Sequence, residues 1–161
     1  MDVKKIDIAN LVQDYAQSGC FTDEELEKFA TSQILAIPDN LSEDGYCYSR
    51  DSLDLIKYFR NSTNGGHVDI LYTQNQQKHY SFHSFDLYLP ILIIEKIFIP
   101  TVIGLLTSYI YDKIRGYEDQ KPMVKSKLIL KEGDTQLELS YEGDAETFCK
   151  TLLELREVGK I

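Results

Sequence analysis

Cysteine is scarce in this sequence, and the three that occur, Cys20, Cys47 and Cys149, lie far apart. None belongs to a Cys-x-x-Cys pair, so the sequence has neither zinc-finger spacing nor a disulfide framework. Isolated cysteines of this kind are typical of a reducing compartment. The first residues also lack an uninterrupted apolar stretch, so we predict no secretory signal and expect a cytoplasmic protein.

Positive charge is also in short supply, because 17 Lys and Arg face 26 Asp and Glu, a formal net charge of −9. A field of that sign repels phosphate backbones, so we expect no nucleic acid among the partners. Residues 113–131 are locally basic, but such scattered charge is typical of a solvated strand and loop. Four acidic residues between 23 and 27 fit the first turn of a helix, where they complement the helix dipole.

Motifs for catalysis are equally sparse. The pair Gly65-Gly66 lacks the following helix and the Lys-Ser/Thr that a phosphate-binding loop requires. The histidines are His67, His79 and His83, and on one strand the last two would lie about 13 Å apart, too far for one metal ion to bridge. We therefore expect no enzyme activity, no cofactor and no metal site. The alternative is an enzyme in which these three histidines meet a cysteine or an aspartate in the fold.

Near its start, the sequence has the apolar periodicity of a helix. Apolar residues repeat at helical spacing over residues 4–18, and Gly19 ends the pattern. A second helix begins after Thr22, which can cap it, with Glu25 at the reciprocal capping-box position. The two segments predict a helical hairpin over residues 1–37.

The pattern breaks at Pro38 and the polar residues that follow it. This composition predicts a linker over residues 38–49 and a second unit, an α+β domain, over residues 50–161. At the start of that unit, Asp51 is placed to cap a short helix. The 161 residues are enough to bury a substantial core.

From residue 67 the hydrophobic period changes from helical to two. Alternation over residues 68–72 and again over 80–82 predicts two antiparallel strands joined by a loop at 74–76. That register would place Ile70 opposite Tyr80.

A second hairpin is predicted near the C-terminus. A two-residue turn at Gly133-Asp134 aligns Leu130 with Leu137 on the apolar face. The same register sets Lys125 opposite Glu142 on the polar face. Two independent features therefore agree on one pairing.

The most apolar part of the chain spans residues 87–114. Glu95-Lys96 divides it and leaves 15 uncharged residues at 97–111, fewer than the roughly 20 that a membrane-spanning helix needs. We expect a central core helix beneath the hairpins, with Pro100 in its first turn. The alternatives are a membrane-associated component that inserts residues 87–111, and a contact with a second copy.

Candidate interface residues lie on this predicted helix. Gly104 and Ser108 are one turn apart, and such small residues let another backbone approach closely. Their neighbours on the apolar side complete the candidate set, which is Val102, Gly104, Leu105, Ser108 and Tyr109.

Together these elements predict an α+β fold. An N-terminal helical hairpin precedes two antiparallel β-hairpins, which pack around a central apolar helix. A C-terminal helix capped by Asp144 closes the fold.

Residues 101–157 combine four parts in a fixed order: the apolar small-residue helix TVIGLLTSYIYDKIRG, the strand MVKSKLILKEG, the strand TQLELSYEGD and the helix AETFCKTLLELRE. This order resembles the effector-associated constant-component domains of bacterial conflict systems. The resemblance implies a non-enzymatic accessory subunit that sits beside an effector or its activator in phage defence. We accordingly expect a protein-interaction or regulatory subunit whose partner is another protein or a second copy of the chain.

Overall fold

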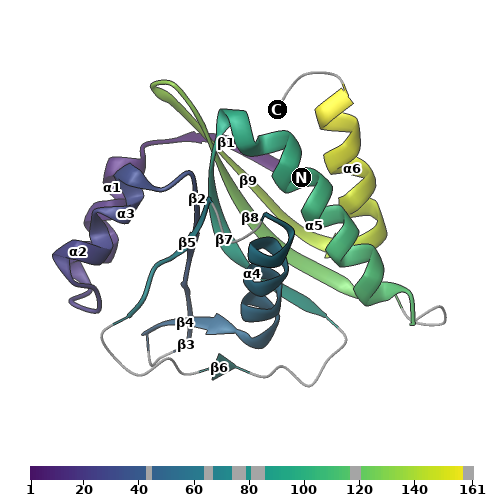
Figure 1. Ribbon diagram of the computed structural model, residues 1–161, viewed down its shortest axis with the longest axis horizontal. Helices are drawn as coiled ribbons and strands as arrows, with labels where there is room; N and C mark the ends of the chain where they lie inside the picture. The colour runs from purple at the N-terminus through teal and green to yellow at the C-terminus, as the bar shows by residue number, and fades with distance from the viewer. Residues whose placement is uncertain (43–44, 64–66, 74–78, 81–85, 117–120, 158–161) are drawn as a thin grey trace.

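The computed structural model describes residues 1–161 except 43–44, 64–66, 74–78, 81–85, 117–120 and 158–161. The described part is a mixed α+β structure built on one six-stranded sheet with helices on both faces (Figure 1). In order across that sheet, the strands are β1 (Asp2–Ile6), β9 (Thr135–Asp144), β8 (Met123–Glu132), β7 (Leu87–Glu95), β2 (Ile34–Ile37) and β5 (Val68–Ile70).

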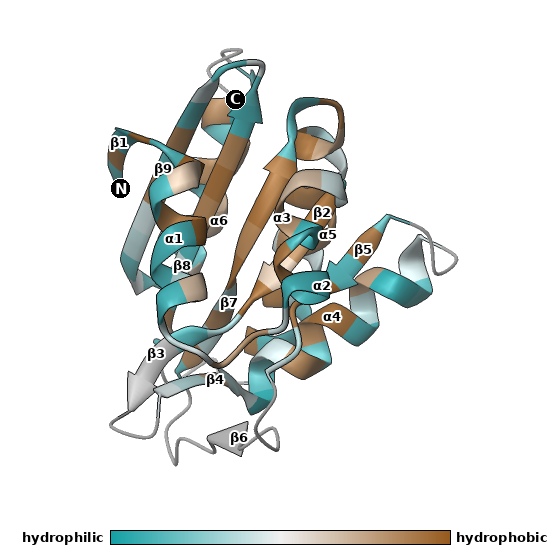
Figure 2. Cartoon of the chain, turned by 90° about the vertical axis from the view of Figure 1, so that its left-hand side faces the viewer, coloured by the Kyte–Doolittle hydropathy of each residue, from teal (hydrophilic) through white to brown (hydrophobic). Residues whose placement is uncertain are grey.

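The central strands are apolar on both faces, as β7 illustrates. It runs parallel to β8 and antiparallel to β2, and Figure 2 shows its hydrophobic colouring. Leu92 and Ile94 are buried on one face, whereas Ile91 and Ile93 are buried on the other. Successive side chains of a strand point to opposite faces, so a strand covered on both sides reads as a continuous apolar run.

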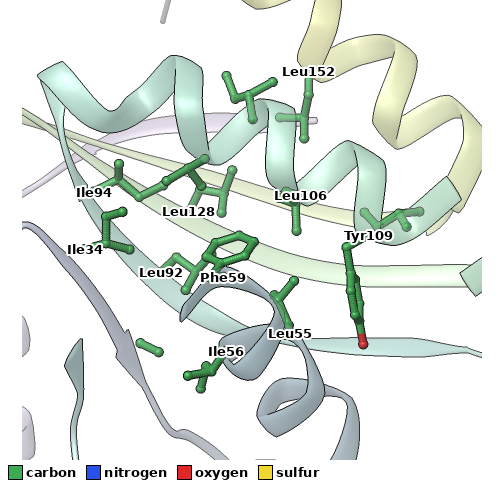
Figure 3. Packing of buried hydrophobic residues seen from close by; sticks show 14 of the residues in the cluster. Ile34, Leu55, Ile56, Phe59, Leu92, Ile94, Leu106, Tyr109, Leu128 and Leu152 are labelled. Carbon is green, nitrogen blue, oxygen red and sulfur yellow. The ribbon is translucent and has the colours of Figure 1, made fainter. Parts of the chain in front are cut away.

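Three helices cover one face of the sheet: α4 (Arg50–Ser62), α5 (Ile99–Ile114) and α6 (Ala145–Glu157). Their inward side chains form the larger core cluster with one face of the strands (Figure 3). Phe59, Leu106 and Leu152 are fully buried there, one from each helix. The helix α5, which follows the short turn η1 (Lys96–Phe98), connects the parallel neighbours β7 and β8, because parallel strands need a crossover.

The opposite face is covered by α1 (Ile8–Gln17) and two single-turn helices, α2 (Asp23–Leu26) and α3 (Lys28–Thr31). Tyr15 is buried at its centre, with ring centroids of Phe21 and Phe29 within 5.4 and 5.6 Å of its own. Its hydroxyl donates to the Pro38 carbonyl at 2.5 Å. Burial, reinforced by Asp39, raises the pKa of Tyr15 far above the ordinary value for a tyrosine.

A second, three-stranded sheet consists of β3 (Asp39–Ser42), β4 (Gly45–Ser49) and β6 (His79–Tyr80). It occupies most of residues 38–49, so the prediction of a linker there is wrong. The predicted units 1–37 and 50–161 also share the main sheet, since β1 pairs with β9 and β2 lies between β5 and β7.

The first predicted β-hairpin is also wrong. β5 pairs in parallel with β2, so Ile70 lies beside Ala36 and not beside Tyr80. β6 pairs instead in parallel with β4. The predicted loop at 74–76 and the end of the predicted second strand lie outside the described residues.

The predictions for two segments need correction. Residues 4–6 of the predicted first helix belong instead to β1, and the helix starts only after Asp7, whose side chain accepts from the Ala9 amide at 2.9 Å. Within the apolar segment 87–114, the α-helix begins at Ile99 and has Pro100 in its first turn as predicted, whereas residues 87–95, for which no strand was predicted, form β7.

The second hairpin has the predicted register, with Leu130 opposite Leu137 and Lys125 opposite Glu142. Two of the predicted helix caps are also confirmed. Thr22 accepts from the Glu25 amide at 3.2 Å, and Asp144 accepts from the Thr147 amide at 2.8 Å. At α4 the cap is Ser49, whereas the predicted cap Asp51 lies in the first turn.

Candidate functional site

A hollow of about 250 Å³ lies on the sheet face that α1, α2 and α3 cover only in part. Its floor is formed by the polar face of the β8–β9 hairpin, where Lys125 lies opposite Glu142 and Lys127 lies opposite Ser140 in the strand register. Asp2 of β1 and Asp39 of β3 also line it. The hollow therefore presents charges of both signs on one sheet face.

The hollow lies where the pairing of β7 with β8 is irregular. Tyr88 is opposite Lys125 and Ile91 is opposite Lys127, so β7 has one residue more than β8 over this stretch. Pro90 lies in that bulge, a position that tolerates a residue without an N–H.

Backbone groups at the bulge find partners in the first turn of α4. The Tyr88 carbonyl accepts from the hydroxyls of Ser49 and Ser52, and the Tyr88 amide donates to the Asp51 carboxylate at 3.4 Å. Burial raises the pKa of Asp51, although the hydrogen bond from Tyr88 opposes the shift. The α4 N-terminus thus holds the bulge, and with it one side of the hollow, in place.

Ser126 belongs to the same stretch of β8 but faces the other way. By strand alternation its side chain shares a face with Val124 and Leu128, which belong to the core beneath the helices. Its hydroxyl is buried, and among the described residues it has no hydrogen-bond partner. It therefore contributes only backbone to the hollow.

Next to the hollow, β1 forms one edge of the main sheet. One side of β1 pairs with β9 over all five residues, and no described strand pairs with its outer side. Residues 2–5 are exposed, and Val3 keeps 55% of its surface accessible. An edge of this kind presents unpaired backbone N–H and C=O groups to solvent.

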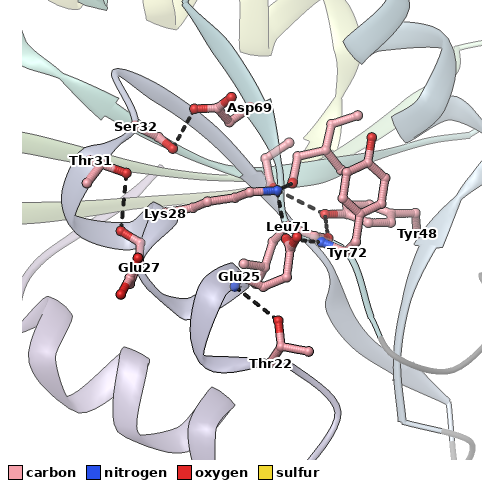
Figure 4. A network of polar contacts seen from close by, with 12 residues as sticks. Thr22, Glu25, Glu27, Lys28, Thr31, Ser32, Tyr48, Asp69, Leu71 and Tyr72 are labelled. Carbon is pink, nitrogen blue, oxygen red and sulfur yellow. Dashed lines mark hydrogen bonds and ion pairs between the residues drawn. The ribbon is translucent and has the colours of Figure 1, made fainter.

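The opposite edge, β5, is short and covered. Lys28 donates to the Ile70 carbonyl at 2.9 Å and to the Glu25 carboxylate at 2.7 Å, and Glu25 also accepts from the Tyr72 amide (Figure 4). Ser32 donates to the Asp69 carboxylate at 2.7 Å. These contacts tie α2 and α3 to β5, and they occupy Glu25 in place of the predicted capping-box bond.

The predicted interface residues lie on α5, across the sheet from the hollow. Val102 and Tyr109 are buried in the core, Leu105 is partly buried, and Ser108 is exposed. A Cβ placed on Gly104 would meet nothing within 4 Å, so no other element of the described chain packs closely there. An interface on this helix stays a prediction, and only its outward residues are accessible to it.

Of the three histidines singled out in the sequence, His67 lies away from the hollow and has its own contacts. His67 has a φ of 85°, its Nδ1 pairs with the Gln33 side-chain oxygen, and its ring centroid lies 4.9 Å from that of Phe98. His79 lies in β6, and His83 lies outside the described residues. Within the described ranges, no three His, Cys, Asp or Glu residues cluster to hold a metal ion. Cys47 and Cys149 are buried.

Sequence reasoning missed this site, although one signal for it was present. The register of the second hairpin already placed Lys125 and Glu142 together on its polar face. The neighbours that enclose this face are Asp2, which precedes the first predicted helix, and Asp39, which lies in the predicted linker. Comparisons with protein-family models, with curated proteins and with solved structures find no match to this chain.

Proposed function

We propose that this chain is a non-enzymatic protein-interaction or regulatory module that takes up an extended strand of another polypeptide along the outer side of β1. The observation that carries the proposal is the contrast between the two edges of the sheet. The β5 edge is covered by side-chain contacts from α2 and α3, whereas β1 has no strand on its outer side within the described chain. Strand addition uses the backbone groups of such an edge.

The hollow supports the same role. It lies close to the β1 edge, with Asp2 in its lining, and it offers cations and anions to a bound chain. Both Lys125 and Lys127 line the hollow, and among the described residues neither forms an ion pair. Mixed charge of this kind suits a polar peptide segment better than a ligand of a single sign.

The class of partner follows from the resemblance of residues 101–157 to effector-associated domains of bacterial conflict systems. We propose that the bound polypeptide is a component of a phage-defence assembly in the cytoplasm: an effector, its activator or a further copy of this accessory chain. In that role the chain is an accessory component and carries no catalytic step itself.

Membrane insertion is the less favoured function. In the described part of the chain, one helical segment, Lys96–Ile114, is long and apolar enough to cross a membrane, but the buried core helices of soluble proteins can be equally long and apolar. Insertion of residues 87–111 would also remove β7 from between β8 and β2. The sheet would then lose a central strand whose residues belong to both core clusters.

Two adjacent proline substitutions test the proposal. Along an edge strand, successive residues direct their N–H groups alternately toward the neighbouring strand and toward the unpaired side. One of the variants Val3→Pro and Lys4→Pro therefore removes an N–H from the unpaired side of β1, and the other removes a hydrogen bond to β9. Thermal unfolding identifies the outward variant as the one that keeps the stability of the wild type.

Tagged wild type and this outward variant are then used to capture companions from the native host at moderate salt. We expect a stoichiometric companion with the wild type, strongly reduced with the outward variant and retained by Lys57→Asp, a charge reversal on an exposed part of α4. Equal capture by the wild type and the outward variant would rule out β1 as the binding edge.

A further inference from the structure

We infer that the strand taken up by β1 is β1 of a second copy of this chain, paired antiparallel about a two-fold axis that passes midway between the two Val3 residues. This inference rests on the proposed function and names its partner. A homodimer contact of this type uses the same residues on both copies, so β1 has to be complementary to itself.

Geometry restricts the registers that such a pair can adopt. A two-fold axis perpendicular to the sheet keeps each sheet face continuous, and residues that lie opposite each other must then share a face. Because side chains alternate between the two faces, residues that lie opposite each other must have numbers that differ by an even count. The centre of the pairing therefore falls on a residue and not between two residues. β1 therefore has few self-pairing registers.

Charge selects one of these registers. Centred on Val3, the pairing sets Val3 against Val3 and, on either side, Asp2 against Lys4. A pairing centred on Lys4 would place the two Lys4 side chains directly opposite each other. A pairing centred on Asp2 would likewise place two carboxylates opposite each other. Opposite charges across a strand pair stabilise it and like charges destabilise it, so the Val3 register is favoured.

The surroundings of β1 agree with this register. Asp2 and Lys4 share the face of the hollow, where Lys4 lies 3.6 Å from Glu138. Val3 points to the opposite face beside Leu139 and is more than half exposed. Pairing two copies would cover both Val3 side chains and extend the six-stranded sheet continuously into that of the partner.

The contact is small, because β1 has five residues. Stable dimers bury far more surface than one strand pair of this length, so the association is expected to be weak and to depend on concentration. Sedimentation velocity of the full chain over a wide concentration range is the appropriate measurement. A rising dimer fraction is expected for the wild type.

Charge reversals then test the register. Asp2→Lys sets lysines opposite lysines, and Lys4→Asp sets aspartates opposite aspartates, so each variant alone should dimerise about tenfold more weakly. An equimolar mixture should recover the wild-type level as a heterodimer, because the lysines of one chain face the aspartates of the other at both positions. The double variant Asp2→Lys/Lys4→Asp should recover it as a homodimer.

Controls separate this test from loss of folding and from the proposed function. Lys57→Asp should dimerise as the wild type does, and circular dichroism should be the same for all variants. A wild type that stays monomeric at every concentration would overturn the inference, and so would single variants that dimerise normally or a mixture that does not recover. If the wild type does not self-associate but the outward proline variant still fails to capture a companion, β1 binds a different protein and the proposed function stands. If the wild type does not self-associate and the outward proline variant captures companions as the wild type does, both the dimer and the proposed function are overturned.

Discussion

Two buried serines in the same region differ in their hydrogen bonding. Ser49 accepts from the Ser52 amide at 3.1 Å and donates to the Tyr88 carbonyl, so it both caps α4 and holds the β7 bulge. Ser126 lies in the apolar core, and its hydroxyl has no partner in the described part of the chain. A buried polar group without a partner costs free energy relative to an apolar group of similar shape.

Replacement by alanine should therefore have opposite effects at these two positions. We expect Ser126→Ala to raise the free energy of unfolding by about 1 kcal/mol, and Ser49→Ala to lower it by about 1 to 2 kcal/mol. Urea unfolding of both variants beside the wild type measures the difference. A Ser126→Ala protein that is less stable than the wild type would contradict the assignment of an unpartnered hydroxyl.

At the scale of the element, β7 and the turn that follows it carry apolar residues with different roles. Leu92 in β7 is 1% exposed, whereas Ile97 in η1 is 77% exposed. The segment 87–114 is therefore a central strand, an exposed turn and a covering helix, and its apolar residues do not all belong to the core.

Alanine substitutions should separate these roles. Leu92→Ala should lower the free energy of unfolding by about 2 to 5 kcal/mol, because it leaves a cavity between the sheet and the helices. Ile97→Ala should change it by less than about 0.5 kcal/mol. Denaturant unfolding measures both values, and similar losses for the two variants would show that this segment does not form a buried strand followed by an exposed turn.

On the scale of the whole molecule, two tyrosines and a cysteine of the larger core cluster are buried with their ionisable groups. Tyr48 donates its single hydroxyl proton toward the Ala36 or the Leu71 carbonyl, and burial raises its pKa well above the ordinary value. Burial also raises the pKa of Tyr109, and together with Asp144 it raises that of Cys149 to about 12. These groups keep their protons in the folded state at a pH where the unfolded chain has released them.

This linkage predicts the response to alkaline pH. Below the unfolded pKa values of about 9 to 10 both states hold these protons, and the stabilisation is fully present. As the pH rises through about 9 to 12, the unfolded state loses protons first, so the free energy of unfolding should fall. Urea midpoints at about pH 7, 9 and 11 measure this slope. Tyr48→Phe should be less stable at neutral pH but should lose stability less steeply, and an unchanged slope would exclude Tyr48 as a contributor.

The sequence by itself determined those features that depend on residues close together in the chain. The hairpin register around Gly133-Asp134 follows from alternation on both sides of a two-residue turn. The caps at Thr22 and Asp144 each depend on an amide three residues ahead. In both cases the interacting groups are only a few residues apart, so spacing alone selects the partner.

Only the tertiary structure decided which strands are neighbours, and with them the edge and the hollow. A short apolar run such as residues 87–95 suits a buried helix or a strand covered on both faces, and only the layers that enclose it distinguish the two. Ile70 lies beside Ala36, and β1 lies beside β9, across large separations in sequence. These pairings follow from burying both faces of one sheet beneath helices that are distant in the chain, a condition that no local pattern of residues expresses.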